Sequence, residues 1–329
     1  MRILAVDDDP IILELLAQFA ITVGNHDLET ALSGTEALEI ANSAGSDPFD
    51  CFLFDIQMPE MDGIQLTQTI RRSPPYADTP ILMLTAMSDK RHVDAAFSAG
   101  ATDYVTKPFE VLELKARLGL VENLVQARQS RTKKVFATQG ISATSQPYVP
   151  AGRLEIFEPI SIYDVDNVIE IVALENYVAQ LSRSTLFGST AFAFTIRKVE
   201  EHYQTMSAFE FHGLVSDVAE VISDTLAGRQ FLMSYAGSGT FVCVTESGWR
   251  PDMSALMDAV NLSLSRTELY GRGGQKLHVR VSAGEVIRLV WKSGNSLMEA
   301  LAAAHVSAEA ASTSHERGLK DLWMVEQRA

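Results

Sequence analysis

Five polar side chains in the first third of the chain close or follow short apolar runs. They are Asp7, Asp8, Asp55, Thr85 and Lys107. Apolar runs of this length, bounded by turn residues, are typical of buried strands, so each group is predicted at the carboxyl end of a strand. In an open parallel sheet those ends border one unfilled crevice, which is where ligands bind. The sequence therefore predicts carboxylates, a hydroxyl and an ammonium around a single site.

Gathered carboxylates repel one another unless a cation neutralises them, and oxygen ligands of this kind suit Mg²⁺. The metal would also shield an incoming phosphoryl group, so that Asp55 could attack phosphorus as a nucleophile. Lys107 and Thr85 could then hold the phosphoryl oxygens. Taken singly, the polar groups allow plainer roles: Asp9 is predicted as a helix cap, Thr85 could simply end a strand, and Tyr104 could be a core residue with a solvated hydroxyl.

The elements that must position these groups alternate between strand and helix. Strands are predicted at Ile3–Val6, His26–Ser33, Phe49–Phe54, Pro80–Thr85 and Tyr104–Thr106. Helices are predicted from Pro10, at Thr35–Ala41, Gly63–Arg72 and Asp89–Ala99, and from Glu110 to about Arg131. This order predicts a doubly wound, five-stranded parallel sheet with right-handed crossovers and helices on both faces, the α/β class.

Four motifs occur in a characteristic order: VDDDP (6–10), DIQMPEMDG (55–63), LTA (84–86) and YVTKPF (104–109). In this order and spacing, the N-terminal part of the chain resembles the flavodoxin-like receiver domain of two-component response regulators. The resemblance covers roughly residues 1–125. It implies a histidine kinase or phosphotransfer protein as phosphodonor.

The resemblance also implies a role for each residue of the site. Asp55 would be the phospho-acceptor. The metal oxygens would come from Asp8, Asp55 and the main-chain carbonyl of Gln57, with Asp7 completing the acidic pocket. Thr85 would bond a phosphoryl oxygen, and Lys107 would pair with it. Tyr104 would be the aromatic switch residue that turns inward when Thr85 is drawn to the phosphate.

Beyond this region the helix from Glu110 continues past what a compact domain needs, which favours a role in dimerisation or signal transmission and makes a homodimer plausible. The stretch Ala137–Gly152, rich in Ser, Thr, Gly and Pro, is predicted to be a linker. We therefore divide the chain into a receiver at 1–125, a helix end and linker at 126–159, and a second domain at 160–329.

The second domain is predicted to be α+β, with an antiparallel hairpin and helices on one face of its sheet. Its predicted helices are Ile162–Ser182, Phe209–Leu226, Ser254–Tyr270 and Ser296–Ala311, and its predicted strands are Ala191–Val199, Phe231–Tyr235, Thr240–Thr245 and His278–Ala283. The segments ALENY (173–177), YAGSGTFVCV (235–244) and VRVSAG (279–284) resemble the GGDEF domain of diguanylate cyclases, a nucleotide-cyclase-like fold.

That resemblance is degenerate where the chemistry lies. Gly239 and Thr240 stand where the family has its acidic pair, and Ala191–Val199 contains no Asp or Glu. The family's allosteric RxxD motif is also missing, because Gly228 and Phe231 occupy its places. Cyclising GTP needs two divalent ions, so we expect a catalytically silent domain that binds a downstream protein or dimerises. The alternative is an active or nucleotide-sensing cyclase-type enzyme. The glycine clusters at 237–239 and 271–274 could also cradle a phosphate, although hairpin turns explain both more simply.

The composition of the chain excludes several other classes of function. The chain has 329 residues and a formal net charge of −15, which argues against sequence-independent binding to nucleic acid or to an anionic membrane. Its two cysteines, Cys51 and Cys243, lie inside apolar runs and suggest neither a disulfide framework nor a metal site. Since no apolar run approaches the length of a membrane span, we expect no membrane insertion and a cytoplasmic location.

Overall fold

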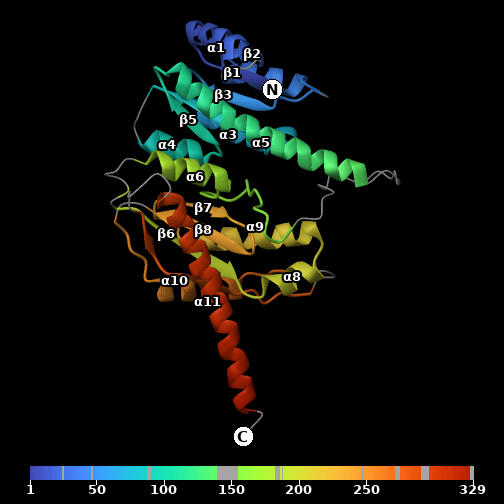
Figure 1. Cartoon of the computed structure of the whole chain (residues 1–329), viewed down its shortest axis with the longest axis vertical. Helices are drawn as coiled ribbons and strands as arrows, with labels where there is room; N and C mark the ends of the chain where they lie inside the picture. The colour runs from blue at the N-terminus through green and yellow to red at the C-terminus, as the bar shows by residue number, and fades with distance from the viewer. Residues whose placement is uncertain are drawn as a thin grey trace. The chain divides into compact units, whose positions relative to one another are not determined.

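The computed structural model describes residues 1–23, 26–45, 47–86, 90–138, 155–181, 186, 188–245, 248–270, 275–289 and 296–326. The chain forms two compact units, Met1–Gly152 and Arg153–Ala329 (Figure 1). The predicted linker Ala137–Gly152 lies, beyond Thr138, outside the described residues. Within the described part of the chain, no helix combines the length and apolar character that crossing a bilayer requires.

The first unit is built on a five-stranded parallel sheet in the order β2-β1-β3-β4-β5. The strands are β1 Arg2–Val6, β2 Asp27–Ala31, β3 Cys51–Asp55, β4 Ile81–Thr85 and β5 Asp103–Thr106. The helices are α1 Pro10–Val23, α2 Gly34–Ser43, α3 Gly63–Arg71, α4 Lys90–Ser98 and α5 Val111–Thr138. The predicted doubly wound sheet is confirmed, and α5 continues past its predicted end near Arg131.

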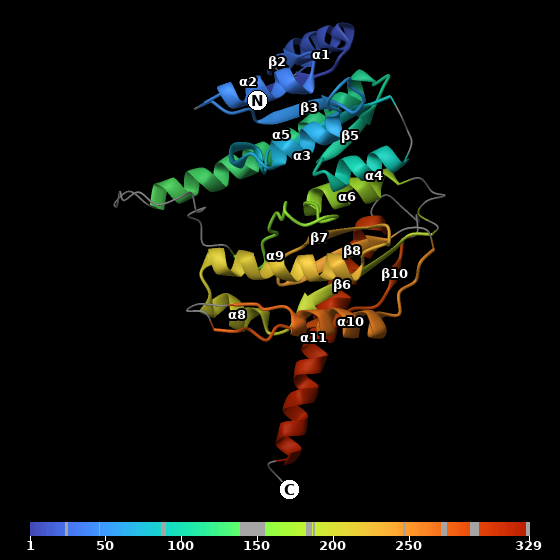
Figure 2. The ribbon, with the colours of Figure 1, turned by 180° about the vertical axis from the view of Figure 1, so that it is seen from behind.

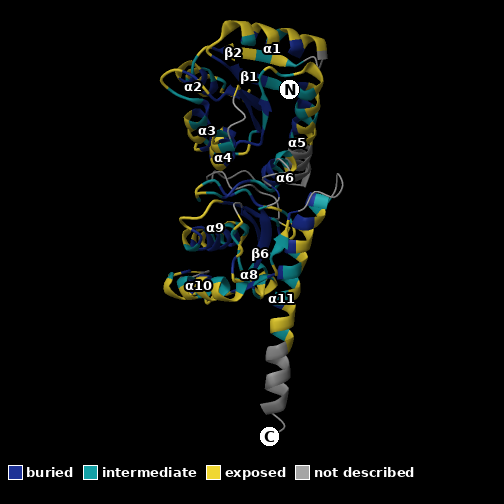
Figure 3. Cartoon of the chain, turned by 90° about the vertical axis from the view of Figure 1, so that its left-hand side faces the viewer, coloured by how far each residue is buried: buried dark blue, intermediate teal, exposed yellow. Residues whose placement is uncertain are grey.

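Helices cover both faces of this sheet (Figure 3). Residues of α1 and α5, including Leu16 and Leu118, pack with alternate strand residues such as Leu53 on one face. On the other face, residues of α2, α3 and α4 pack against the intervening strand residues, such as Phe52 and Phe54. The central strand β3 is buried throughout, which explains its uninterrupted apolar sequence.

The second unit has a sheet in the order β10-β6-β8-β7, with β9 also paired to β6, and its pairings are antiparallel. The strands are β6 Thr190–Ile196, β7 Phe231–Tyr235, β8 Thr240–Thr245, β9 Val281–Ala283 and β10 Ile287–Arg288. The helices are α6 Ile171–Gln180, α8 Val199–Thr205, α9 Ala208–Thr225, α10 Met253–Arg266 and α11 Ser296–Glu326 (Figure 2). The predicted hairpin Phe231–Tyr235 and Thr240–Thr245 coincides with β7 and β8.

Helices lie on both faces of this second sheet, so the prediction of helices on one face is wrong. Phe192 and Phe194 pack in a cluster with α9 and α10, whereas α11 packs against β6, and Figure 3 shows the strand between α9 and α11. All seven residues of β6 are buried. Because side chains alternate along a strand, this pattern requires cover on both sides, and the small residues Ala191 and Ala193 allow close approach on the second face.

The prediction of a helix over Ile162–Ser182 is also wrong in its first half, because the helix begins only at Ile171. The main chain before it follows the edge of β7: Met233 N–H donates to the Asn167 carbonyl at 2.8 Å, and Ile169 N–H donates to the Met233 carbonyl at 2.8 Å. Asn167 has φ of +62°, which no helix accommodates. Pairing with a strand edge therefore outweighs the local helical pattern. The predicted strand Ala191–Val199 likewise ends early, and Val199 begins α8.

Candidate functional site

The parallel register of the first sheet brings the predicted polar groups to one edge. Val6 is paired with Phe54, Asp55 with Leu84, and Thr85 with Thr106. The carboxyl ends of β1, β3, β4 and β5 are thus level with one another. The residues at or just past those ends meet at the crevice where parallel sheets bind ligands.

An ammonium group bridges two of the acids. Lys107 Nζ lies 2.5 Å from Asp7 Oδ2 and 2.6 Å from Asp55 Oδ1. The two aspartates are nearly inaccessible, with 1% and 4% of their surface exposed, and the Lys107 side chain is 15% exposed. Burial raises the pKa of Asp55 and the nearby charge of Asp7 adds to that, whereas Lys107 works in the opposite direction. Burial disfavours the Lys107 ammonium, but its two carboxylate partners outweigh that effect and raise its pKa.

Main-chain N–H groups hold the remaining carboxylate oxygens in place. Gln57 N–H donates to Asp55 Oδ2 at 2.8 Å, and Asp9 N–H donates to Asp7 Oδ1 at 3.0 Å. Asp9 in turn accepts a bond from Ile11 N–H at 2.9 Å, as a helix cap does. These bonds fix the orientation of both buried carboxylates before any ligand arrives.

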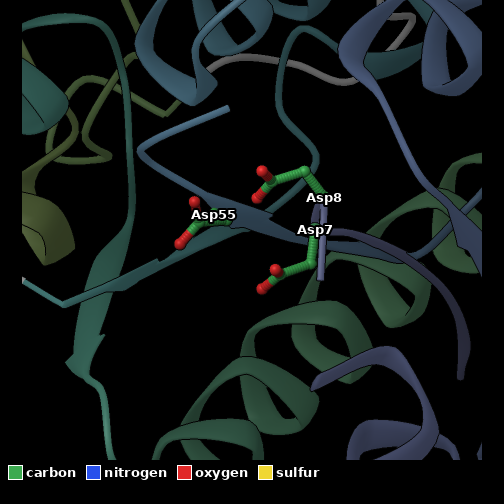
Figure 4. Close-up of side chains that lie close together, drawn as sticks. All are labelled: Asp7, Asp8 and Asp55. Atoms are coloured by element: carbon green, nitrogen blue, oxygen red, sulfur yellow. The ribbon is translucent and has the colours of Figure 1, made fainter. Parts of the chain in front are cut away.

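Asp7, Asp8 and Asp55 form a set of oxygen ligands. One ligand atom from each lies within 4.8 Å of the others, and Figure 4 shows the three side chains turned toward a common space. Asp8 is exposed, so this space is accessible from solvent. Three closely spaced carboxylates, of which only two contact the ammonium, suit a hard divalent cation such as Mg²⁺. The use of the Gln57 carbonyl as a ligand stays a prediction; its N–H is the group that contacts Asp55.

The loop after Asp55 depends on Gly63, a role that the sequence reasoning missed. A Cβ at this position would lie 2.0 Å from the Asp55 carbonyl oxygen, and Gly63 N–H donates to the Ile56 carbonyl at 2.9 Å. Asp62 caps α3 through a reciprocal capping box with Gln65. Only glycine therefore lets the loop fold back directly beneath the site. The Asp-Gly pair in the sequence signals the turn but not the contact with the backbone of the phospho-acceptor candidate.

Thr85 and Tyr104 stand on the two strands beside Lys107. Thr85 is buried at the end of β4, and its carbonyl accepts a bond from Lys107 N–H at 2.6 Å. Tyr104 is half-buried, and its ring packs edge-on against Phe97 of α4 with centroids 6.1 Å apart. The roles of Thr85 as phosphoryl ligand and of Tyr104 as switch remain predictions.

A second contact missed from the sequence joins β5 to α5. Asp103 is buried, and its Oδ2 lies 2.9 Å from Arg117 of α5. Its other oxygen accepts a bond from Tyr104 N–H at 2.8 Å. The strand that carries Tyr104 is thereby tied to the long helix. An arginine between the buried residues Leu114 and Leu118 is the sequence signal that could have indicated a buried partner.

In the second unit, the glycine-rich turn between β7 and β8 is occupied by the chain's own groups. Ser238 N–H donates to the Ile156 carbonyl at 2.7 Å, and Gly239 N–H donates to the Tyr235 hydroxyl at 3.0 Å. A Cβ on Gly237 would lie 2.2 Å from the Phe157 carbonyl oxygen. The N–H groups of Ser238 and Gly239, which could otherwise cradle a phosphate in this turn, are therefore already bonded within the chain. The glycines serve a tight turn with close main-chain approach.

Next to that turn, Thr195 of β6 faces Thr240 of β8. The two residues are paired in register, both are buried, and their hydroxyls are hydrogen-bonded at 2.9 Å. A neutral pair thus occupies the place where β6 and β8 meet beside the turn. Such a pair satisfies its own hydrogen bonds without a metal.

Comparison with known proteins identifies the first unit. Residues 3–119 match the family described as response regulator receiver domain. The chain is 36% identical over 117 residues to the DNA-binding dual master transcriptional regulator RpaA of Synechocystis, an alignment that covers 36% of this chain and 47% of that protein. It is also 36% identical over 142 residues to the response regulator MprA of Mycobacterium leprae, covering 43% of this chain and 57% of that one. The chain thus spans about half the length of these curated relatives.

Among solved structures, the chain is similar to the chemotaxis protein CheY4 of Vibrio cholerae, with 34% identity and a TM-score of 0.34. That match covers 36% of this chain and 97% of the other. Together with the parallel sheet and the acidic strand-end site, the family match shows that the N-terminal part of this chain is a response regulator receiver domain of the two-component type.

Proposed function

We propose that this protein is a response regulator that is phosphorylated on Asp55 with the help of Mg²⁺ and signals through a catalytically silent GGDEF-like domain. The observation that carries the proposal is the position of Lys107 Nζ, within 2.6 Å of both Asp7 and Asp55. An ammonium held between two buried carboxylates, next to a third exposed one, provides both the nucleophile and a cation to receive the charge of a phosphoryl group.

The residues have distinct tasks in this proposal. The Asp55 carboxylate, oriented by Gln57 N–H, attacks phosphorus, and the bond from phosphorus to the donor breaks. Asp8 and Asp55 would hold Mg²⁺, which supplies charge neutralisation for the phosphoryl oxygens and the carboxylates. Lys107 then exchanges its contact with Asp55 for one with a phosphoryl oxygen, and the Thr85 hydroxyl donates to another.

The phosphodonor in this proposal is a histidine kinase or a phosphotransfer protein. Phosphorylation shifts a population between two arrangements of β4, β5 and α5, because Thr85 and Tyr104 respond to the phosphoryl group. The ion pair between Asp103 and Arg117 supports α5 as the element that receives the change. The helix would carry the signal onward, to a downstream protein or to a second copy of the chain. The DNA binding named for the relative RpaA is not extended to this chain, whose net charge is −15.

Two observations support a silent second domain over an active or nucleotide-sensing cyclase. The hydroxyl pair of Thr195 and Thr240 offers no charge to bind a divalent metal. The N–H groups of Ser238 and Gly239 bond within the chain, so they are not available to cradle a nucleotide phosphate; the glycines at 271–274 lie outside the described residues. Incubating the full chain with GTP and Mg²⁺ or Mn²⁺, with and without a phosphodonor, should yield no cyclic dinucleotide. Product formed at a rate that depends on phosphorylation would refute this part.

Acetyl phosphate with Mg²⁺ tests the receiver part directly. Intact mass should show one added phosphoryl group on the wild type and on Asp27→Asn, a matched change on the exposed edge strand β2. Asp55→Asn should show none, and Asp8→Asn or EDTA should reduce the wild-type yield strongly. Phosphorylation that persists in Asp55→Asn would overturn the assignment of the acceptor.

A further inference from the structure

Arg197, which follows β6, is a half-buried cation that contacts only neutral side chains. Its Nε donates to Ser282 Oγ at 2.9 Å, one terminal nitrogen lies 2.7 Å from His315 Nε2, and the other lies 3.9 Å from Met257 Sδ. Within the described part of the chain, no carboxylate comes within ion-pair distance of its guanidinium. Since a guanidinium only donates, His315 Nε2 must be the acceptor, so the imidazole is neutral in this arrangement.

A second arginine adds to the positive charge at this place. Arg197 N–H donates to the Arg280 carbonyl at 2.9 Å, and the Arg280 side chain is exposed. Burial, and then the nearby charge of Arg280, lower the pKa of Arg197. The pKa of His315 is lowered by burial, by Arg197 and by Arg280. Three groups that could carry positive charge are therefore close enough to influence one another; they come from the residue after β6, the residue before β9, and α11.

Two acids lie near enough to weaken this charge but do not pair with the arginines. Asp258 of α10 acts on Arg197 from a distance, and Glu316 acts on His315. Glu316 already accepts a bond from Lys198 N–H at 3.3 Å. The positive charge of Arg197 and Arg280 is therefore only partly offset, and a bound anion would neutralise it.

We propose that Arg197, Arg280 and His315 form a binding site for the phosphate group of a small phosphorylated molecule, and that this site needs no divalent metal. A tetrahedral dianion matches donors that come from three elements, and it can neutralise two guanidinium groups, whereas a carboxylate offers one charge and two oxygens. Ser282 and Met257 contact the Arg197 guanidinium and hold it in place (α10, α11 and β6 are labelled in Figure 2). The site would exist whether or not the receiver proposal above is correct.

Binding should draw a proton onto His315. In the free protein, His315 Nε2 accepts a hydrogen bond from Arg197. When an anion accepts that guanidinium N–H instead, Nε2 can take up a proton and donate it in a hydrogen bond to the anion. The groups facing His315 are Arg197, Arg280 and Glu316. Because the two arginines oppose protonation and an added dianion favours it, phosphate should raise the imidazole pKa. Sulfate, which remains a dianion over this range, should consequently bind more strongly as pH falls through the pKa of His315.

The test is calorimetric titration of the full chain with inorganic phosphate in the presence of EDTA, followed by titrations with sulfate, acetate and GTP. Wild type should bind phosphate and sulfate but not acetate. Arg197→Gln should lose about tenfold or more in affinity, the effect of one charge-assisted hydrogen bond. Arg280→Gln should weaken binding several-fold; being exposed, it also serves as the variant least able to disturb folding. GTP binding with equal or higher affinity would indicate a nucleotide as the source of the phosphate, and phosphate binding without GTP binding would indicate a smaller molecule.

Arg288→Gln is the matched control, since Arg288 pairs with Thr190 at the opposite end of β6, about 20 Å away, and should leave affinity unchanged. Proton NMR of the histidines adds a separate measurement: phosphate should raise the pKa of His315 in wild type and not in Arg197→Gln. The proposal is overturned if wild type shows no saturable phosphate binding, if all three arginine variants bind equally, or if binding appears only when Mg²⁺ is added.

Discussion

Replacing Lys107 with methionine removes the ammonium from between two buried carboxylates while keeping most of the apolar stem. Asp7 and Asp55, whose side chains are 1% and 6% exposed, would then face each other with no cation between them. Breaking a buried ion pair in this way typically lowers the free energy of unfolding by about 3–5 kcal/mol. We therefore expect Lys107→Met to destabilise the first unit markedly at neutral pH.

Protonation sets a ceiling on this loss. One of the two acids can take up a proton instead of staying charged. For an aspartate of ordinary pKa, pH 7 lies about 3 units above the pKa, so protonation costs at most about 4 kcal/mol. Near pH 5 the same step spans about 1 unit, so the loss should shrink to about 1.5 kcal/mol. The sign follows from linkage: in the variant the folded-state pKa is raised, so the protonated carboxyl stabilises the fold at low pH. That contribution is lost as pH rises from the unfolded pKa through the folded one.

The assay is urea unfolding of the full chain in EDTA, followed by far-ultraviolet circular dichroism. All three tryptophans lie in the second unit, so their fluorescence separates its transition from that of the receiver. Lys90→Met, which breaks a partly exposed pair with Asp94, should cost less than about 1 kcal/mol and serves as the control. Excess Mg²⁺ should restore part of the stability of Lys107→Met, as should adding Asp55→Asn. A loss that is the same near pH 5 and pH 7, or no rescue by either route, would refute the electrostatic reasoning.

Three further outcomes follow from the described contacts. Gly63→Ala should destabilise the receiver by about 3 kcal/mol or more in urea unfolding, because the new Cβ would lie 2.0 Å from the Asp55 carbonyl oxygen. It should also reduce phosphorylation by acetyl phosphate. Wild-type behaviour would contradict the close contact. Thr195→Val should lower the free energy of unfolding by about 1–3 kcal/mol, because it leaves the Thr240 hydroxyl unbonded. Changing both threonines to valine should cost less than the single change. Additive losses would contradict the hydrogen-bonded pair. Both cysteine thiols should react with a disulfide reagent only as fast as the fold opens. Burial raises the pKa of Cys51 to about 12 and also raises the pKa of Cys243, so neither thiol is ionised in the native protein. Rapid reaction of the native protein would be inconsistent with this burial.

The receiver fold could be predicted from sequence because the signals that identify its strands are local. Strands such as Cys51–Asp55 are fully buried, so their composition identifies them, and parallel topology then brings their carboxyl ends together. The bridge from Lys107 to Asp7 and Asp55 follows from that topology. The ion pair of Asp103 with Arg117 could not be predicted, because it depends on how α5 is rotated against the sheet.

In the second unit, contacts between segments that are distant in sequence determine more of the fold than they do in the receiver. Asn167–Ile169 bond to Met233 on the edge of β7, and a local helical pattern contains no information about that edge. The register that sets Thr195 opposite Thr240, and the approach of Phe157 to Gly237, likewise arise between distant segments. The absence of Asp and Glu from Ala191–Val199 can be read from the sequence. The hydrogen bond between the Thr195 and Thr240 hydroxyls cannot.

In the proposed function, Asp55, beside Lys107, takes a phosphoryl group directly onto its carboxylate. Treating the protein with acetyl phosphate and Mg²⁺, reducing the product with borohydride, and mapping it by peptide mass spectrometry tests this most directly, since an aspartyl phosphate is reduced to homoserine. We expect homoserine at position 55, dependent on Mg²⁺ and lost when EDTA is present. Homoserine at another aspartate, or phosphate found on a hydroxyl or histidine with residue 55 unmodified, would contradict it.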